Sequence, residues 1–163
     1  MHQPEKYLEK ILTPDEAKLK IAGWRHLGHT VVFTNGVFDL LHEGHLHSLE
    51  RAAREGDHLV VAINSDESVK RLKGPNRPIQ SQTTRARVVA ALLLSDVVIV
   101  FEEDTPAALI EHLQPDVLVK GGDYSVEQIA GAESVLKRGG RIVINPLIEG
   151  FSTTASIQKM KRD

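Results

Sequence analysis

Five short apolar runs, separated by segments of helical pattern, constrain the fold of this chain more than any other feature. The runs are rich in β-branched residues and nearly unbroken, as in strands that are buried on both faces of a parallel sheet. They cover residues 30–35, 58–64, 97–101, 116–120 and 141–145. Such strand–helix–strand repeats form right-handed crossovers. The sequence therefore predicts an α/β fold: a doubly wound, mainly parallel five-stranded sheet with helices on both faces.

Helical patterns occupy the segments between and around these runs. We expect helices over 14–27, 43–55, 83–94, 105–113, 125–138 and 153–161. Asp96 and Gly139-Gly140 are expected to stop helices, and Thr105-Pro106 and Ser125 to start them. The 163 residues contain no repeat or linker. We therefore expect one domain over 1–163, with a leading helical segment over 1–28 and the main core over 29–163.

Composition excludes several classes of protein. The chain has no cysteine, which excludes disulfides, thiolate metal sites and a thiol nucleophile. The net charge of −2 argues against a surface that coats nucleic acid or an anionic membrane. The longest apolar run, at 88–94, is far shorter than the roughly 20 residues that span a bilayer. We expect a cytoplasmic protein with no nucleic-acid or membrane partner.

The stretch TNGVFDLLHEGH, at 34–45, joins the first strand to the first core helix. Gly36 permits a close backbone approach, and a helix that begins near 42–44 presents free amides to an anion. His42 and His45 share one helix face, where both can donate to phosphate oxygens. A metal site is the alternative, but HExxH is absent and no third ligand has fitting spacing. An ordinary helix start is the other alternative.

A second phosphate contact is expected near the C-terminus, in EGFSTT at 149–154. Ser152, Thr153 and Thr154 offer hydroxyls and helix-start amides. By itself this segment is also an ordinary N-cap. Each of the two segments follows a strand, so both would reach the crevice at the carboxyl ends of the sheet.

Basic residues are concentrated between the second and third strands. Residues 70–87 contain six of them and no acid: Lys70, Arg71, Lys73, Arg77, Arg85 and Arg87. This local excess suits a polyphosphate or a phosphorylated substrate, although a solvated face is the alternative. Arg85 lies near the start of a predicted helix, where the helix dipole disfavours a cation. We therefore expect Arg85 to face an anion.

The segment VKGGDY, at 119–124, follows the fourth core strand. Gly121 and Gly122 would let the backbone lie against a planar base or a ribose, and Asp123 could accept a hydrogen bond from a sugar hydroxyl. A simple turn is the alternative.

Taken together, these motifs resemble those of the cytidylyltransferase-like nucleotidyltransferases. The resemblance rests on GxFDxxHxGH after a first strand and on STT near the C-terminus. It implies that His42 and His45 contact the triphosphate of the incoming nucleotide, and that Lys73 and Arg85 contact phosphates. LVKGGDY, VAINSDESVKRLKG, RPIQ and FEEDTP further resemble one branch, the adenylyltransferases of ADP-heptose synthesis.

That branch implies the substrates ATP and D-glycero-β-D-manno-heptose 1-phosphate, with Mg²⁺ held mainly by the ATP phosphates and no protein metal ligand. The nucleotide would contact Thr34, Asn35, Gly36, Phe38, Asp39, Gly121, Asp123, Ser152, Thr153 and Thr154. The sugar phosphate would contact Asn64, Asp66 and Arg77. Asp39 either binds in the site or ties down the turn.

Two alternative functions stay open. Many cytidylyltransferases carry an arginine where this chain has Leu147, which disfavours a cytidylyltransferase for another alcohol or sugar phosphate. A nucleotide-binding regulator without turnover is the alternative from another class. Members of this family are often dimers, so the resemblance is compatible with a homodimer but does not fix the oligomeric state.

Overall fold

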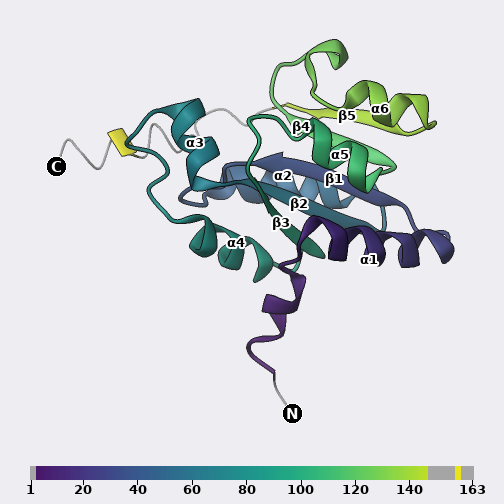
Figure 1. The fold of residues 1–163 in the computed structure, drawn as a ribbon, viewed down its shortest axis with the longest axis horizontal. Helices are drawn as coiled ribbons and strands as arrows, with labels where there is room; N and C mark the ends of the chain where they lie inside the picture. Colours follow the sequence, from purple (N-terminus) through teal and green to yellow (C-terminus); the bar gives the residue numbers. More distant parts are fainter. Residues whose placement is uncertain (1–2, 147–156, 159–163) are drawn as a thin grey trace.

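All five predicted strands form one sheet, and every pairing in it is parallel. The computed structural model describes residues 3–146 and 157–158. The strand order is β3-β2-β1-β4-β5 (Figure 1). The strands are β1 Val31–Gly36, β2 His58–Asn64, β3 Val97–Phe101, β4 Val117–Gly121 and β5 Arg141–Asn145. The predicted doubly wound α/β sheet is confirmed.

Helices cover both faces of this sheet (Figure 1). On one face, α1 (Pro14–His26), α5 (Ala107–Leu113) and α6 (Ala132–Lys137) bury apolar side chains against the strands. On the other face, α2 (Glu43–Ala53) and α4 (Gln82–Ala90) do the same. Each inner strand therefore buries both of its faces, which explains the unbroken apolar runs in the sequence.

The leading helix α1 packs on the protein's own sheet. Its start is a capping box: Glu16 N donates to Thr13 Oγ1, and Thr13 N donates to the Glu16 carboxylate. Ala17 and Ile21 are buried against the sheet. The Trp24 ring stacks on His58 at 3.8 Å between centroids. Helix α1 thus contributes to the same core as the helices and strands that follow it.

Two features of the N-terminal half differ from the expected helices. A short 3-10 helix, η1 (Lys6–Lys10), precedes α1 and was not predicted. The helix expected over 83–94 ends at Ala90, because the Ser95 hydroxyl donates to the Val89 carbonyl at 2.8 Å. Asp96 is not a helix stop; its carboxylate accepts the backbone N–H of Leu59 and ties β3 to β2.

The helix expected over 125–138 is two elements, η2 (Val126–Gln128) and α6. Gly131, at φ +85°, separates them, and a Cβ at that position would lie 2.7 Å from Ile110 Cδ1. The helix α3 (Asp66–Lys73) was also missed. Its N-cap is Ser65, whose hydroxyl accepts from Ser68 N. The helix expected over 153–161 lies outside the described residues, apart from 157–158, which are helical.

The strand order places a topological switch beside β1. The chain runs outward from β1 to β2 and β3, then returns to the other side of β1 with β4 and β5. Loops that leave β1 and β4 therefore diverge at the carboxyl edge, where ligand crevices form in such sheets. No helix within the described residues is long and apolar enough to cross a membrane.

Candidate active site

His42 and His45 lie together at the start of α2. His42 is the N-cap residue, and its ring stacks on that of His45 with 3.9 Å between centroids. The backbone N–H of His42 donates to His45 Nδ1 at 3.3 Å. Because Nδ1 accepts this bond, neutral His45 carries its proton on Nε2, where it can be donated to a ligand. The expected pairing of the two histidines on one face is confirmed.

Burial disfavours the charged form of both imidazoles. Burial, with a smaller contribution from the nearby His42 ring, lowers the pKa of His45 to about 4, while the Asp39 charge opposes the shift. Burial also lowers the pKa of His42. An arriving phosphate would favour the charged forms, because an adjacent anion raises the pKa of an imidazole. The pair is therefore a neutral donor site that can gain charge when an anion binds.

The loop before α2 is tightly wound. Phe38 and Leu40 both have positive φ, at 51° and 50°. The Phe38 ring covers Gly36, where a Cβ would lie 3.0 Å from Phe38 Cε2, and it lies 5.6 Å from the His45 ring. Gly36 thus makes room for the Phe38 ring, and its expected contact with a nucleotide stays a prediction. Phe38 is only 7% exposed, and its ring lies against the ring of His45.

Asp39 ties down the loop between α3 and α4. Its carboxylate is 1% exposed and accepts from Ile79 N at 2.7 Å, Gln80 N at 3.0 Å and Arg77 Nε at 3.2 Å. Of the two roles left open for Asp39, the geometry supports the second. Arg77, expected at the sugar phosphate, has this carboxylate as its partner.

Arg85 has protein acceptors for its guanidinium. The residue is fully buried and donates to Val37 O at 2.7 Å, Gln80 O at 3.0 Å and Asp66 Oδ1 at 2.8 Å. The anion expected near the start of this helix is therefore Asp66. Arg85 and Asp66 thus join the loop after β1 to the segment between α3 and α4, and their expected contacts to phosphate and sugar stay predictions.

Thr34 and Asn64 are buried at the ends of their strands. Thr34 Oγ1 donates to Val119 O at 3.0 Å, joining β1 to β4, and Asn64 Nδ2 donates to Ser68 Oγ at 3.1 Å. Both side chains thus donate their hydrogen bonds to other groups of the protein. Asn35 and Gly121, at the ends of β1 and β4, are partly exposed at the same edge.

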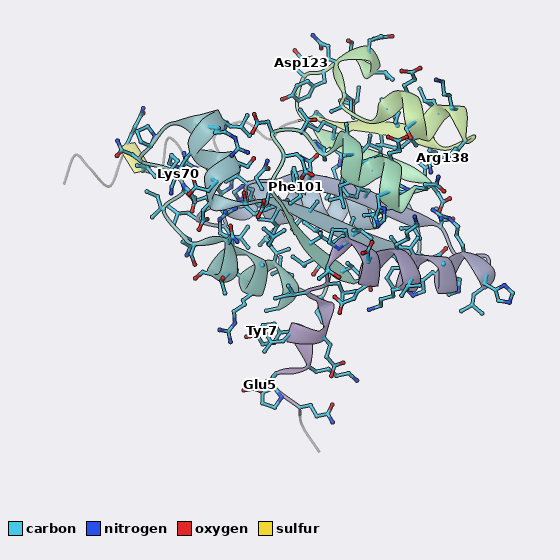
Figure 2. All side chains as sticks on the ribbon, in the orientation of Figure 1. Glu5, Tyr7, Lys70, Phe101, Asp123 and Arg138 are labelled. Atoms are coloured by element: carbon cyan, nitrogen blue, oxygen red, sulfur yellow. The ribbon has the colours of Figure 1, made fainter. Side chains whose placement is uncertain are left out.

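Asp123 is exposed on the loop after β4, and Figure 2 shows it at the upper edge of the molecule. The expected contacts Ser152, Thr153 and Thr154, and Leu147 with them, lie outside the described residues. The second phosphate contact therefore stays a prediction.

Lys120 also lies at the carboxyl edge of the sheet, and the sequence analysis did not single it out. It lies at the end of β4, partly buried, with its Nζ 5.6 Å from the centre of the Tyr124 ring. Burial lowers the pKa of its ammonium group, and the charge of Lys73, at the end of α3, lowers it further. The sequence motif itself contains this residue, because Lys120 directly precedes the two glycines of VKGGDY.

The chain belongs to the cytidylyltransferase-like family, whose sequence model matches residues 33–157. This is a family of nucleotidyltransferases. Among curated relatives, the bifunctional protein HldE of Mesorhizobium japonicum is 50% identical over 160 residues, 98% of this chain and 32% of the relative. HldE of Koribacter versatilis is 53% identical over 150 residues, 92% of this chain and 31% of the relative. The chain thus spans about a third of the length of these relatives.

Two solved structures share the fold. A lipopolysaccharide core biosynthesis protein from Thermoplasma volcanium is 30% identical, with a TM-score of 0.59, over 74% of this chain and 98% of that one. A pantoate-beta-alanine ligase from Francisella tularensis has a TM-score of 0.57 at 16% identity, over 83% of this chain and 66% of that one. The second likeness concerns the fold alone.

Proposed function

We propose that this protein transfers AMP from ATP to D-glycero-β-D-manno-heptose 1-phosphate, giving ADP-heptose and pyrophosphate in the cytoplasm. The observation that carries the proposal is the stacked pair His42 and His45 at the start of α2, the helix that follows β1. The likeness to HldE proteins and to a lipopolysaccharide core biosynthesis protein supports the choice of acceptor.

The reaction is an in-line displacement at the α-phosphorus of ATP. A phosphate oxygen of the sugar 1-phosphate forms the new P–O bond, and the bond to the β-phosphate breaks as pyrophosphate leaves. The nucleophile is already anionic, so no strong general base is needed. The protein has to align two polyanions and stabilise the charge that develops on the α-phosphate and the leaving group.

In this scheme the histidines bind the α- and β-phosphates. The Nε2–H of His45 is directed by the hydrogen bond at Nδ1, so this donor needs no reorganisation when the substrate binds. Asp39 and Arg85 hold the two loops that carry the site. Asn35, Gly121 and Asp123 would face the nucleotide, and Ser152, Thr153 and Thr154 would complete the phosphate contacts.

We expect Mg²⁺ to be bound mainly through the ATP phosphates. Among residues 3–146 and 157–158, no group of three or more histidine and carboxylate side chains could hold a metal ion. Protein-bound Mg²⁺ commonly has substrate phosphates and one or two carboxylates as ligands. The donors gathered here, imidazoles and lysine ammonium groups, suit phosphate oxygens. When bound, the ion would neutralise charge on the phosphates.

Pyrophosphate release tests the proposal. We expect release with ATP only when heptose 1-phosphate is present, and little with CTP. A preference for CTP would favour a cytidylyltransferase, and no release with any acceptor would favour a nucleotide-binding regulator.

The roles of the histidines are tested in the same assay. His42→Ala or His45→Ala should lower kcat by about 100-fold or more, since a donor aimed at developing charge contributes roughly 3 kcal/mol. Glu43→Gln, an exposed neighbour between them, is the matched control and should keep wild-type turnover. Near-normal turnover in either histidine variant would refute the assigned role.

A further inference from the structure

We propose that His29 and His58 form a proton-sensitive clasp, which holds the C-terminal part of α1 on the sheet and opens when both rings are protonated. His29 precedes β1, and His58 is the first residue of β2. His29 Nδ1 and His58 Nε2 lie 2.9 Å apart. The clasp is at the amino edge of the sheet, opposite the histidines of α2, so the inference goes beyond the proposed function.

The backbone next to both rings is fixed. Asp57 N and His58 N both donate to Thr30 O, at 2.9 and 3.2 Å. The Asp57 carboxylate in turn accepts the backbone N–H of Thr30 at 2.7 Å. The turns that precede β1 and β2 are thus joined beside the clasp, and this joint keeps the two imidazoles opposite each other.

The clasp is connected to α1 through Trp24, the single tryptophan of the chain. The Trp24 ring stacks on His58 with 3.8 Å between centroids and 8° between the ring planes. His29 N also donates to Trp24 O at 3.1 Å. Both histidines therefore contact the last turns of α1, and a change in how they meet alters how this helix is held.

Asp96 determines where the first proton binds. Its Oδ2 lies 3.9 Å from His58 Nδ1, and that buried nitrogen has no hydrogen-bond partner among the described residues. A proton on Nδ1 is stabilised by the adjacent carboxylate, and it leaves Nε2–H to donate to His29 Nδ1. The singly protonated pair therefore keeps its hydrogen bond and gains the attraction of Asp96.

A second proton breaks the contact. In the singly protonated pair His29 Nδ1 is the acceptor, so the proton of the neutral His29 ring is on Nε2. The second proton must bind at Nδ1, where two N–H groups would then face each other and two positive charges would repel. Because the open clasp binds one proton more than the closed clasp, acid favours opening.

The other charged groups near the clasp balance one another. Asp96 and Asp57 are the acids. Lys20 lies over the Trp24 ring at 5.3 Å, and Lys10 of η1 acts electrostatically on Asp96. Carboxylates and ammonium groups ordinarily keep their charge near neutral pH, where imidazoles titrate. The histidine pair is therefore the group whose charge changes when the medium becomes mildly acidic.

Hydrogen exchange of the backbone amides, corrected for the intrinsic exchange rate, tests the clasp between about pH 7.5 and about pH 5.5. The protection factors of α1 amides should fall by up to about tenfold per pH unit, since opening takes up one proton. Amides of β3 report global unfolding and should fall less. His29→Asn puts an uncharged acceptor in place of Nδ1, so it should keep α1 protected in acid. His26→Asn, at an exposed histidine in the last turn of α1, is the matched control and should behave as the wild type.

Unchanged protection of α1 across this pH range would overturn the proposal, as would a fall in His29→Asn as large as that in the wild type. A parallel fall in α1 and β3 would do the same, because the loss would then be global. Acrylamide quenching of Trp24 fluorescence is the second readout: it should increase in acid in the wild type and in His26→Asn, and stay constant in His29→Asn. Neither measurement needs a substrate, so both results are independent of the proposed function.

Discussion

Replacing Arg85 by methionine should destabilise the whole fold and not only weaken nucleotide binding. The guanidinium is fully buried and bonds two backbone carbonyls and Asp66. Methionine fills similar space, but it leaves both carbonyls and the carboxylate without their donor. Breaking a buried ion pair costs about 3–5 kcal/mol. Asp66 is 30% exposed and can regain water, so the low end, about 3 kcal/mol, is expected.

Urea denaturation measures this loss as a change in the free energy of unfolding. Arg87→Met is the matched control: it lies two residues further along α4, is exposed, and has one long hydrogen bond of 3.4 Å to Tyr7. The control should change the free energy of unfolding by less than about 0.5 kcal/mol. A loss below about 1 kcal/mol in Arg85→Met, together with a large rise in KM for ATP, would refute the positioning role and restore the phosphate contact.

Three further predictions follow from the site. The pKa of His45 is about 4 against an ordinary 6.5, so the free energy of unfolding should fall as pH drops from about 6.5 to about 4 and level off below. Allowing for partial solvent exposure, the fall is about 1–2 kcal/mol, and urea titrations at several pH values should find it reduced in His45→Ala. Asp39→Asn removes the charge that receives Ile79 N and Gln80 N, so it should cost about 2 kcal/mol in urea denaturation and lower kcat. Gly122→Ala should lower the free energy of unfolding by about 1 kcal/mol or more in urea denaturation, because φ is +129° at this position and a Cβ would lie 2.5 Å from Tyr124 Cε2.

The strands and their burial on both faces were predictable, because unbroken β-branched runs of this length are typical of the strands of a parallel sheet. The β2 and β3 runs begin and end as expected, at His58–Asn64 and Val97–Phe101. Helix boundaries were less accurate, because contacts distant in sequence decide them. The position of Ile110 requires glycine at 131, and this glycine divides the expected helix over 125–138.

The helix α3 was missed for a different reason, because its sequence does contain the signals of a helix. Its sequence has a serine cap, acids in the first turn and bases in the last, which is the pattern of a helix stabilised by its dipole. The same basic residues also fit a phosphate site, so the sequence alone did not decide between the two readings. Lys70 is paired with Glu67 on the same helix, whereas Arg71 is paired with Asp104, 33 residues further along the chain.

The charged residues of the site illustrate why sequence alone could not rank them. A cation near a helix start implies a nearby anion, and that inference held for Arg85; the sequence could not reveal that the anion is Asp66 from α3. Partners of this kind come from segments that the fold brings together. Arg77 shows the same relation, since its carboxylate partner Asp39 lies 38 residues earlier in the chain.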